Sequence, residues 1–283
     1  MKLYFAEDVK LRRTLYSLLI VISIVIGVAY FENGGEILLS FMYSFVSFVF
    51  LRLAMESTLE HIDKNKLKKI LTILYEDRDP AKFLEEIEES IDFESIEKAQ
   101  ITDILIHKSI ANCYLGNWEK ANSILDYVAD KTEDENFILK LSFYRIMFKI
   151  LQGKTDRISK DIEIFEAILT SKKTVKLRRS TLKSDKNKMK YLNSFDIRIL
   201  ECDLLSKICD GGELSKEDEA VLDKLLKLED TALRLEMLHY YAATNKIFEN
   251  EISEAKEYLM KIDVDKGNTI IQKKSKKLLA TLA

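Results

Sequence analysis

The residues best suited to chemistry are the histidines, and their spacing forms no recognised catalytic or metal-binding motif. His61, His107 and His239 lie far apart, and none is within four residues of another histidine or of a cysteine. The sequence also lacks a glycine-rich phosphate-binding loop, a His-Glu-x-x-His pattern, a Cys-x-x-Cys pair and a Gly-x-Ser-x-Gly elbow. Folding can still bring distant residues together into a site. We nevertheless expect a protein with no enzymatic activity, no cofactor and no bound metal.

The three cysteines predict neither a disulfide framework nor a metal site. Cys113, Cys202 and Cys209 are few and lie in apolar surroundings, which fits a reducing compartment. Cys202 and Cys209 are seven residues apart, a spacing typical of one face of a buried helix. We therefore expect them in the core.

The composition indicates an all-α protein that does not bind nucleic acid. The chain has 283 residues, with 44 Lys and Arg against 47 Asp and Glu, and a formal net charge of -3. A nucleic-acid-binding domain usually carries a strong basic excess, so this balance argues against one. Only 8 Gly and 1 Pro are present. A sheet-rich protein needs more of both for its turns, so helices joined by short connections are expected.

Charge is segregated along the chain. Residues 171–190 hold nine basic side chains against one acidic, whereas residues 76–97 hold ten acidic against two basic. The basic segment is predicted to be a loop that contacts anionic lipid headgroups or an acidic protein surface, with binding that weakens at high salt. Alternatively, it pairs with the acidic segments or faces water. The candidate contact residues are Lys172, Lys173, Lys176, Arg178, Arg179 and Lys183.

Residues 1–55 are predicted to form a transmembrane hairpin. Residues 14–31 carry no charge, and these 18 positions make about 27 Å of helix, close to the thickness of a bilayer core. Residues 37–55 form a second span, in which Arg52 can reach the headgroups. Residues 32–36 allow only a tight reversal. A cleaved signal peptide and a buried hairpin in a soluble core are the alternatives, but the two long successive apolar segments favour two spans.

Positive charges flank the hairpin on one side. Lys and Arg occur at position 2 and within residues 10–13, again at Arg52 and within residues 64–69, and the loop between the spans has none. By the positive-inside rule, both termini are expected in the cytoplasm and the spans in the plasma membrane. The spans lack ionisable interior residues, so we expect no transport pathway. The Lys- and Ile-rich composition is compatible with a bacterial source.

Small residues recur at helical spacing in both spans. Such a seam lets two helices approach closely and lets hydroxyl groups bond across them. The two seams can pack on each other, or the serine seam of the second span can dock a partner membrane protein. The candidate residues are Ser23, Gly27, Ser40, Ser44 and Ser47.

Residues 56–283 are predicted to form about ten helices arranged as pairs. Apolar residues recur every three or four positions, and no segment shows a sustained strand pattern. Glycines at 116, 153, 211–212 and 267 mark expected helix ends. Gly116 and Gly153 are 37 residues apart, within the range of two-helix repeats.

Residues 110–128 (IANCYLGNWEKANSILDYV) resemble the core of a tetratricopeptide (TPR) repeat. Ala111 and Tyr114 correspond to the end of the first helix, Gly116 and Trp118 to the turn, and Ala121 to the small packing position of the second helix. Residues 254–259 are similar to a second-helix fragment. The turn is about two residues shorter than in the family, and the closing proline is missing. The resemblance implies an α-solenoid that binds proteins and assembles complexes.

These features lead to two functional hypotheses of different kinds. In the first, the hairpin anchors a cytoplasmic TPR-like solenoid that acts as a scaffold and binds another protein, itself membrane-associated. In the second, the chain is an auxiliary or regulatory subunit of a membrane transporter or envelope complex and docks through its hairpin. An enzyme would instead show a concave pocket with converging carboxylates or histidines of perturbed pKa.

Overall fold

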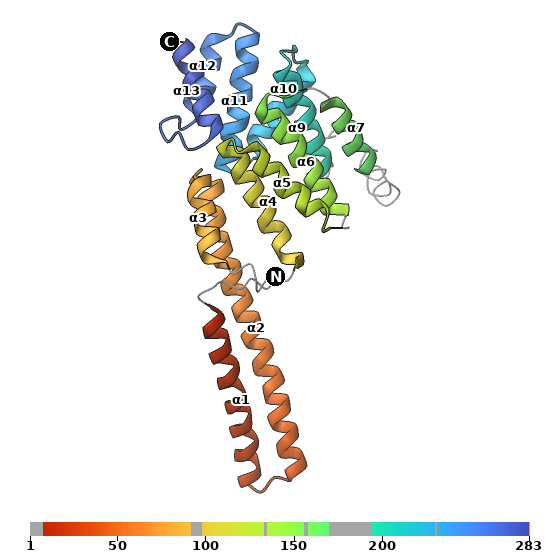
Figure 1. Cartoon of the computed structure of the whole chain (residues 1–283), viewed down its shortest axis with the longest axis vertical. Coiled ribbons are helices and arrows are strands. Elements are labelled where there is room, and N and C mark those ends of the chain that lie inside the picture. The colour runs from red at the N-terminus through yellow and green to blue at the C-terminus, as the bar shows by residue number, and fades with distance from the viewer. Residues whose placement is uncertain are drawn as a thin grey trace. The chain divides into compact units, whose positions relative to one another are not determined.

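The computed structural model of the chain describes residues 8–91, 98–132, 135–155, 158–169, 194–229 and 231–282. These residues form twelve α-helices and include no β-strand, which confirms the all-α prediction (Figure 1). The chain divides into two compact units. One comprises residues 1–72 and 83–102, and the other comprises residues 73–82 and 103–283.

The first unit contains a helical hairpin, in which α1 (Asp8–Glu32) and α2 (Ile37–Tyr75) run antiparallel (Figure 1). The chain reverses at Gly34, whose φ of +86° favours glycine, and the Gly35 N–H donates to the Tyr30 carbonyl at 3.2 Å. Two helices are long and apolar enough to cross a membrane, one over Thr14–Glu32 and the other being α2. Only 17% and 6% of their most apolar windows are buried, whereas a core helix of a soluble protein would be mostly buried.

Helix α2 does not end at residue 55, where the second span was expected to finish, but continues to Tyr75. The extension contains no Gly or Pro. Its charged side chains also support the helix, because Arg52 pairs with Glu56 at 3.0 Å and Lys64 with Glu60 at 2.8 Å, both four residues apart. The next helix, α3 (Pro80–Ser90), begins after Asp79, whose Oδ1 accepts the Lys82 N–H at 3.1 Å.

Apart from residues 73–82, the described part of the second unit is formed by four helix pairs and a final helix, the first pair beginning in the other unit at Lys98. Neighbouring pairs contact each other through α5 and α6, through α7 and α9, and through α10 and α11, and the final helix packs on the last pair (Figure 1). The pairs are α4 (Lys98–Leu115) with α5 (Trp118–Ala129), α6 (Glu135–Gln152) with α7 (Ile158–Leu169), α9 (Ser194–Cys209) with α10 (Lys216–Leu228), and α11 (Ala232–Phe248) with α12 (Ile252–Met260), followed by α13 (Ile270–Leu282).

The first helix of each pair ends in the same turn. Gly116, Gly153, Gly211 and Asn250 take the left-handed conformation, with φ of 86°, 74°, 71° and 62°. In each case the N–H of this residue bonds to the carbonyl three positions earlier, and the following N–H bonds to the carbonyl five positions before it. This is the Schellman pattern of helix termini. The first three glycines therefore mark helix ends as predicted, whereas Gly267 lies in the loop between α12 and α13.

Small residues allow the two helices of the first pair to approach closely. Ala111 in α4 and Ala121 in α5 are fully buried. The buried Ser109 hydroxyl donates to the Ala121 carbonyl at 2.7 Å, which fixes α4 against α5. Large apolar side chains such as Phe148 and Phe165 fill the core of this unit.

Candidate functional site

Within the described residues, a pocket of about 260 Å³ is lined by α4, α6 and α9, each the first helix of its pair. Helices α4 and α6 contribute residues at the same spacing, i, i+3 and i+4, which places each set on one face of its helix. We call this the aromatic pocket. Its lining residues are Asp103, Ile106, His107, Lys140, Phe143, Tyr144 and Arg198.

An ion pair with a buried glutamate fixes the position of the Arg198 guanidinium. Its Nη1 bonds to Oε2 of the fully buried Glu201 at 2.8 Å, and Arg234 Nη2 bonds to the other Glu201 oxygen at 2.5 Å. Glu229 accepts from Arg234 Nε at 3.1 Å. The Arg198 and Arg234 guanidinium carbons lie 5.2 Å and 5.7 Å from the centre of the Phe143 ring. Arg198 is therefore fixed in a network in which Glu201 and Glu229 balance the charges of Arg198 and Arg234.

His107 in this pocket is hydrogen-bonded and neutral. Its Nδ1 lies 2.8 Å from the Tyr75 hydroxyl, and the two rings meet edge to face at 5.6 Å. Burial lowers the pKa of His107 to about 4. Such a group is a weak base at neutral pH. Among the described residues that line the pocket, none is a serine or a cysteine.

The rim of the aromatic pocket carries charges that are only weakly paired. Lys140 Nζ lies 3.5 Å from Asp103 Oδ1, and both side chains are 47% exposed. Exposed ion pairs of this kind contribute about 0–1 kcal/mol. Lys140 can therefore exchange Asp103 for a ligand carboxylate, while Ile106, Phe143 and Tyr144 offer apolar contacts to the group beside it.

A second concave surface, of about 570 Å³, lies on α5, α6 and α7, and we call it the polar groove. Two ion pairs occur in it, Arg145 with Asp126 at 2.6 Å and Lys149 with Asp161. Its lining residues are Asn122, Asp126, Ser142, Arg145, Ile146, Lys149, Gln152, Lys154, Asp161 and Ile164.

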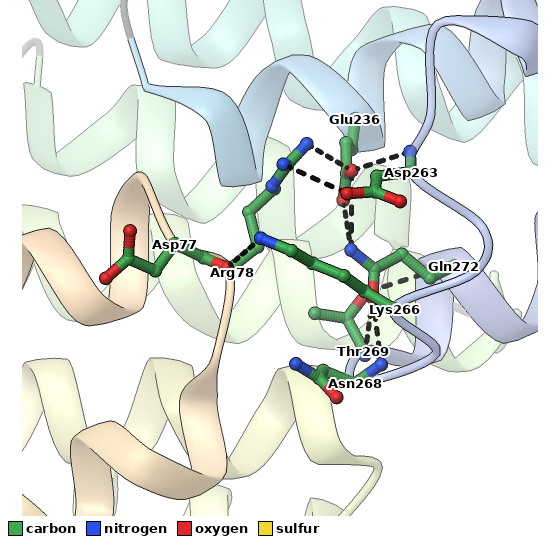
Figure 2. A network of polar contacts seen from close by, with 8 residues as sticks. All are labelled: Asp77, Arg78, Glu236, Asp263, Lys266, Asn268, Thr269 and Gln272. Atoms are coloured by element: carbon green, nitrogen blue, oxygen red, sulfur yellow. Dashed lines mark hydrogen bonds and ion pairs between the residues drawn. The ribbon is translucent and has the colours of Figure 1, made fainter.

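A partly buried polar network holds the connection between α2 and α3, and Figure 2 shows its residues. Arg78 has a left-handed φ of 56° and points to Glu236 in α11, with Nη1 2.8 Å from Oε1. Its Nη2 lies 3.4 Å from Asp263 Oδ2, and Lys266 Nζ donates to the Asp77 carbonyl at 2.9 Å. A non-glycine residue in this conformation is strained, so these contacts offset the strain at Arg78.

Glu236 is the centre of this network. It is 2% exposed and accepts bonds from the Asp263 N–H at 3.0 Å and from Gln272 Nε2 at 3.0 Å, besides Arg78. Gln272 in turn accepts the Thr269 N–H at 3.1 Å (Figure 2). Burial raises the pKa of Glu236, although its donors favour the charged form. The network therefore fixes residues 77–78 to α11 and to the α12–α13 loop.

The predicted small-residue seam lies largely inside the hairpin. A Cβ atom on Gly27 would stand 2.9 Å from Ser44 Cβ and 3.0 Å from the Ser40 carbonyl oxygen, so α1 and α2 are in close contact there. The Ser44 hydroxyl donates to the Ser23 carbonyl at 2.7 Å. Ser23 and Ser40 are buried, and Ser47 is half-buried. A partner helix would therefore have to contact mainly other residues of the hairpin.

The repeat-signature residues meet at the α4–α5 turn. Ala111, Tyr114 and Ala121 are buried, Gly116 forms the turn, and Trp118 is half-buried. We compared the chain with models of known protein families, with curated proteins and with solved structures, and none of them matches. The resemblance to a TPR repeat therefore rests on the residues of this segment.

Neither the basic segment, nor a metal-binding cluster, nor the cysteines add a site to the described structure. The basic residues Lys172, Lys173, Lys176, Arg178, Arg179 and Lys183 lie outside the described residues. Within the described part, no group of three or more His, Cys, Asp or Glu side chains is arranged to hold a metal ion. Cys113 and Cys202 are buried and Cys209 is half-buried, which fits the core position expected of them.

Neither concave surface nor the Arg78 network is marked by a motif in the sequence. The aromatic pocket combines residues 103–107, 140–144 and 198, which only folding brings together. A signal was present in α4 and α6, where aromatic or histidine side chains share a helix face with a charged residue. No local pattern marks Arg78 and Glu236 as partners, because 158 positions separate them.

Proposed function

We propose that the chain is a non-catalytic, membrane-anchored interaction protein whose helical domain binds a segment of another protein in the aromatic pocket. The main observation in support of this proposal is that α4, α6 and α9 all contribute lining residues to that pocket. Repeated helix pairs characteristically bind ligands with the helices that line one face. The two apolar helices α1 and α2 would place this domain at a plasma membrane, with both termini in the cytoplasm.

The chemistry of the pocket defines the ligand segment. Phe143, Tyr144 and Ile106 suit an apolar or aromatic side chain, and Lys140 and Arg198 suit a carboxylate beside it. Because Glu201 already positions Arg198, little side-chain freedom is lost on binding. The expected partner is therefore a protein with an exposed apolar residue next to an acidic residue or a chain terminus.

Photo-crosslinking tests this assignment in cells. A photoreactive amino acid at Asp103, which is 47% exposed at the pocket rim, should form an adduct with one partner, identified by mass spectrometry. The matched control position is Lys216, exposed on α10 and outside both concave surfaces. Lys140→Glu should abolish the adduct at position 103, because it reverses an exposed charge of the pocket, whereas Lys216→Glu should not change it. Equal adducts from both positions, or an adduct indifferent to Lys140→Glu, would overturn the assignment.

A second candidate function is supported by a groove in the hairpin. An apolar groove of about 380 Å³ includes part of the seam. Its lining residues are Ile24, Gly27, Val28, Phe31, Ile37, Ser40, Phe41 and Ser44. A transporter or envelope complex could dock there, and the chain would then be its auxiliary subunit. The same crosslinker at Phe41, which is 71% exposed, distinguishes the two functions. A specific partner captured from position 41 and not from position 103 would favour the auxiliary subunit.

A further inference from the structure

The polar groove uses the face of α6 opposite to the one that lines the aromatic pocket. Successive residues of an α-helix advance by about 100° around its axis. Lys140, Phe143 and Tyr144 thus share one side of α6, and the groove residues of α6 lie on the other. The groove residues are Ser142, Arg145, Ile146, Lys149 and Gln152. A ligand in the groove and a ligand in the pocket would therefore not collide on α6.

The ion pairs of the groove can be exchanged for contacts with a ligand. The side chains of Arg145 and Asp126 are 42% and 66% exposed, and those of Lys149 and Asp161 are 40% and 30% exposed. At such exposure an ion pair contributes about 0–1 kcal/mol, so an incoming carboxylate can replace either aspartate.

The groove has a basic excess that favours an acidic ligand. Lys154 is exposed and forms no ion pair within the described residues, so it adds a positive charge that neither aspartate balances. Arg145 can also hold a carboxylate through two parallel hydrogen bonds.

The remaining side chains of the groove suit an extended peptide. The residues of α6 from Ser142 to Gln152 span about 15 Å along the helix. The amides of Asn122 and Gln152 can both donate to and accept from a peptide backbone. Ile164, 50% exposed, offers an apolar contact at the edge.

We propose that the polar groove binds an acidic, extended peptide segment of a second protein, independently of the aromatic pocket. Helix α6 then presents a separate binding surface on each of two faces. The protein would hold two partners at the membrane at once, a role beyond recognition of a single partner.

The test uses the full chain in nanodiscs of zwitterionic lipid and two fluorescein-labelled nine-residue peptides, of repeat Glu-Ser-Leu and Lys-Ser-Leu. Fluorescence anisotropy should show binding of the acidic peptide only. Asp126→Asn and Asp161→Asn remove the internal competitors, so each should tighten binding about two- to five-fold. The double variant Arg145→Glu with Lys149→Glu should weaken it by about tenfold or more.

A matched control separates the groove from general electrostatics. Lys216→Glu with Lys227→Glu makes the same charge change on exposed positions of α10 and should leave the affinity within twofold. Two results would overturn the proposal: equal binding of the basic peptide, or weaker binding after either aspartate is neutralised. Lys140→Glu changes an exposed charge on the opposite face of α6, at the rim of the aromatic pocket, and should not affect this affinity. Failure of one surface is therefore distinguishable from failure of the other.

Discussion

Removing Glu236 should strongly destabilise the helical domain. In Glu236→Ala, the Arg78 guanidinium loses its closest partner at 2.8 Å, and the Asp263 N–H and Gln272 Nε2 lose their acceptor. Breaking a buried ion pair by removing one member costs about 3–5 kcal/mol. We expect a loss in this range, because the Glu236 side chain is only 3% exposed.

The backbone conformation at Arg78 gives a second, independent test of the network. Because its φ is 56°, any residue with a Cβ is strained there and glycine is not. Arg78→Gly should therefore be less destabilising than Arg78→Ala, by about 1 kcal/mol. Replacing both Arg78 and Glu236 with Met should cost less than the sum of the two single changes, by about 2 kcal/mol, because no unpaired charge stays buried.

The assay is urea unfolding of the full chain in detergent, followed by the fluorescence of Trp118, the single tryptophan. Trp118 belongs to the same compact unit as the network. The control is Lys276→Ala, which removes an ion pair of 3.6 Å between side chains that are 65% and 90% exposed. Its effect should stay below about 0.5 kcal/mol. A loss below about 1 kcal/mol in Glu236→Ala, or equal effects of Gly and Ala at position 78, would refute the reasoning.

Three further predictions concern pH, the hairpin and the helix ends. Burial lowers the pKa of His107 and of His239 to about 4, against 6.5 when exposed, so the unfolded chain binds more protons between these values. The free energy of unfolding should therefore fall as pH drops from 7 to 4, by at most about 3 kcal/mol for His107 and less for half-buried His239. Urea midpoints should fall with it, and His107→Asn should make them depend less on pH. Gly27→Leu should separate α1 from α2, because even a Cβ atom would approach Ser44 Cβ to 2.9 Å. The assay is disulfide formation between cysteines that replace Tyr30 and Tyr43, whose ring centres lie 4.4 Å apart. Gly27→Leu should lower the yield of this disulfide. Gly153→Ala, at φ 74°, should cost about 1–2 kcal/mol in the same unfolding assay, and an unchanged midpoint would contradict the role given to this turn.

The sequence predicted those parts of the fold that depend on local pattern. The uncharged run at 14–31 and the glycines at 116, 153 and 211 specify a helix and three helix ends through neighbouring residues alone. The end of α2 was less predictable, because a polar helix in water keeps the same backbone as the apolar span before it. Asn250 was also missed, since asparagine takes the left-handed conformation less often than glycine.

The candidate site was less predictable than the fold for a different physical reason. Arg198 belongs to the aromatic pocket because Glu201 and Phe143 hold it there, and those contacts depend on how α6 and α9 pack. Apolar periodicity records which face of a helix is buried and not which polar groups meet across helices. The seam residue Ser44 was recognised as a packing residue, but its bond to the Ser23 carbonyl emerges only from the packed hairpin.

Replacement of the membrane anchor tests the central claim most directly. Residues 1–55 are exchanged for an unrelated two-span anchor joined in helical phase with the rest of α2, and the native and chimeric chains are purified gently from the same membrane. If the helical domain carries recognition, mass spectrometry recovers the same partner with both chains, and Lys140→Glu removes it from both. Recovery of a membrane-embedded partner with the native hairpin alone would contradict the claim and identify the hairpin as the interface.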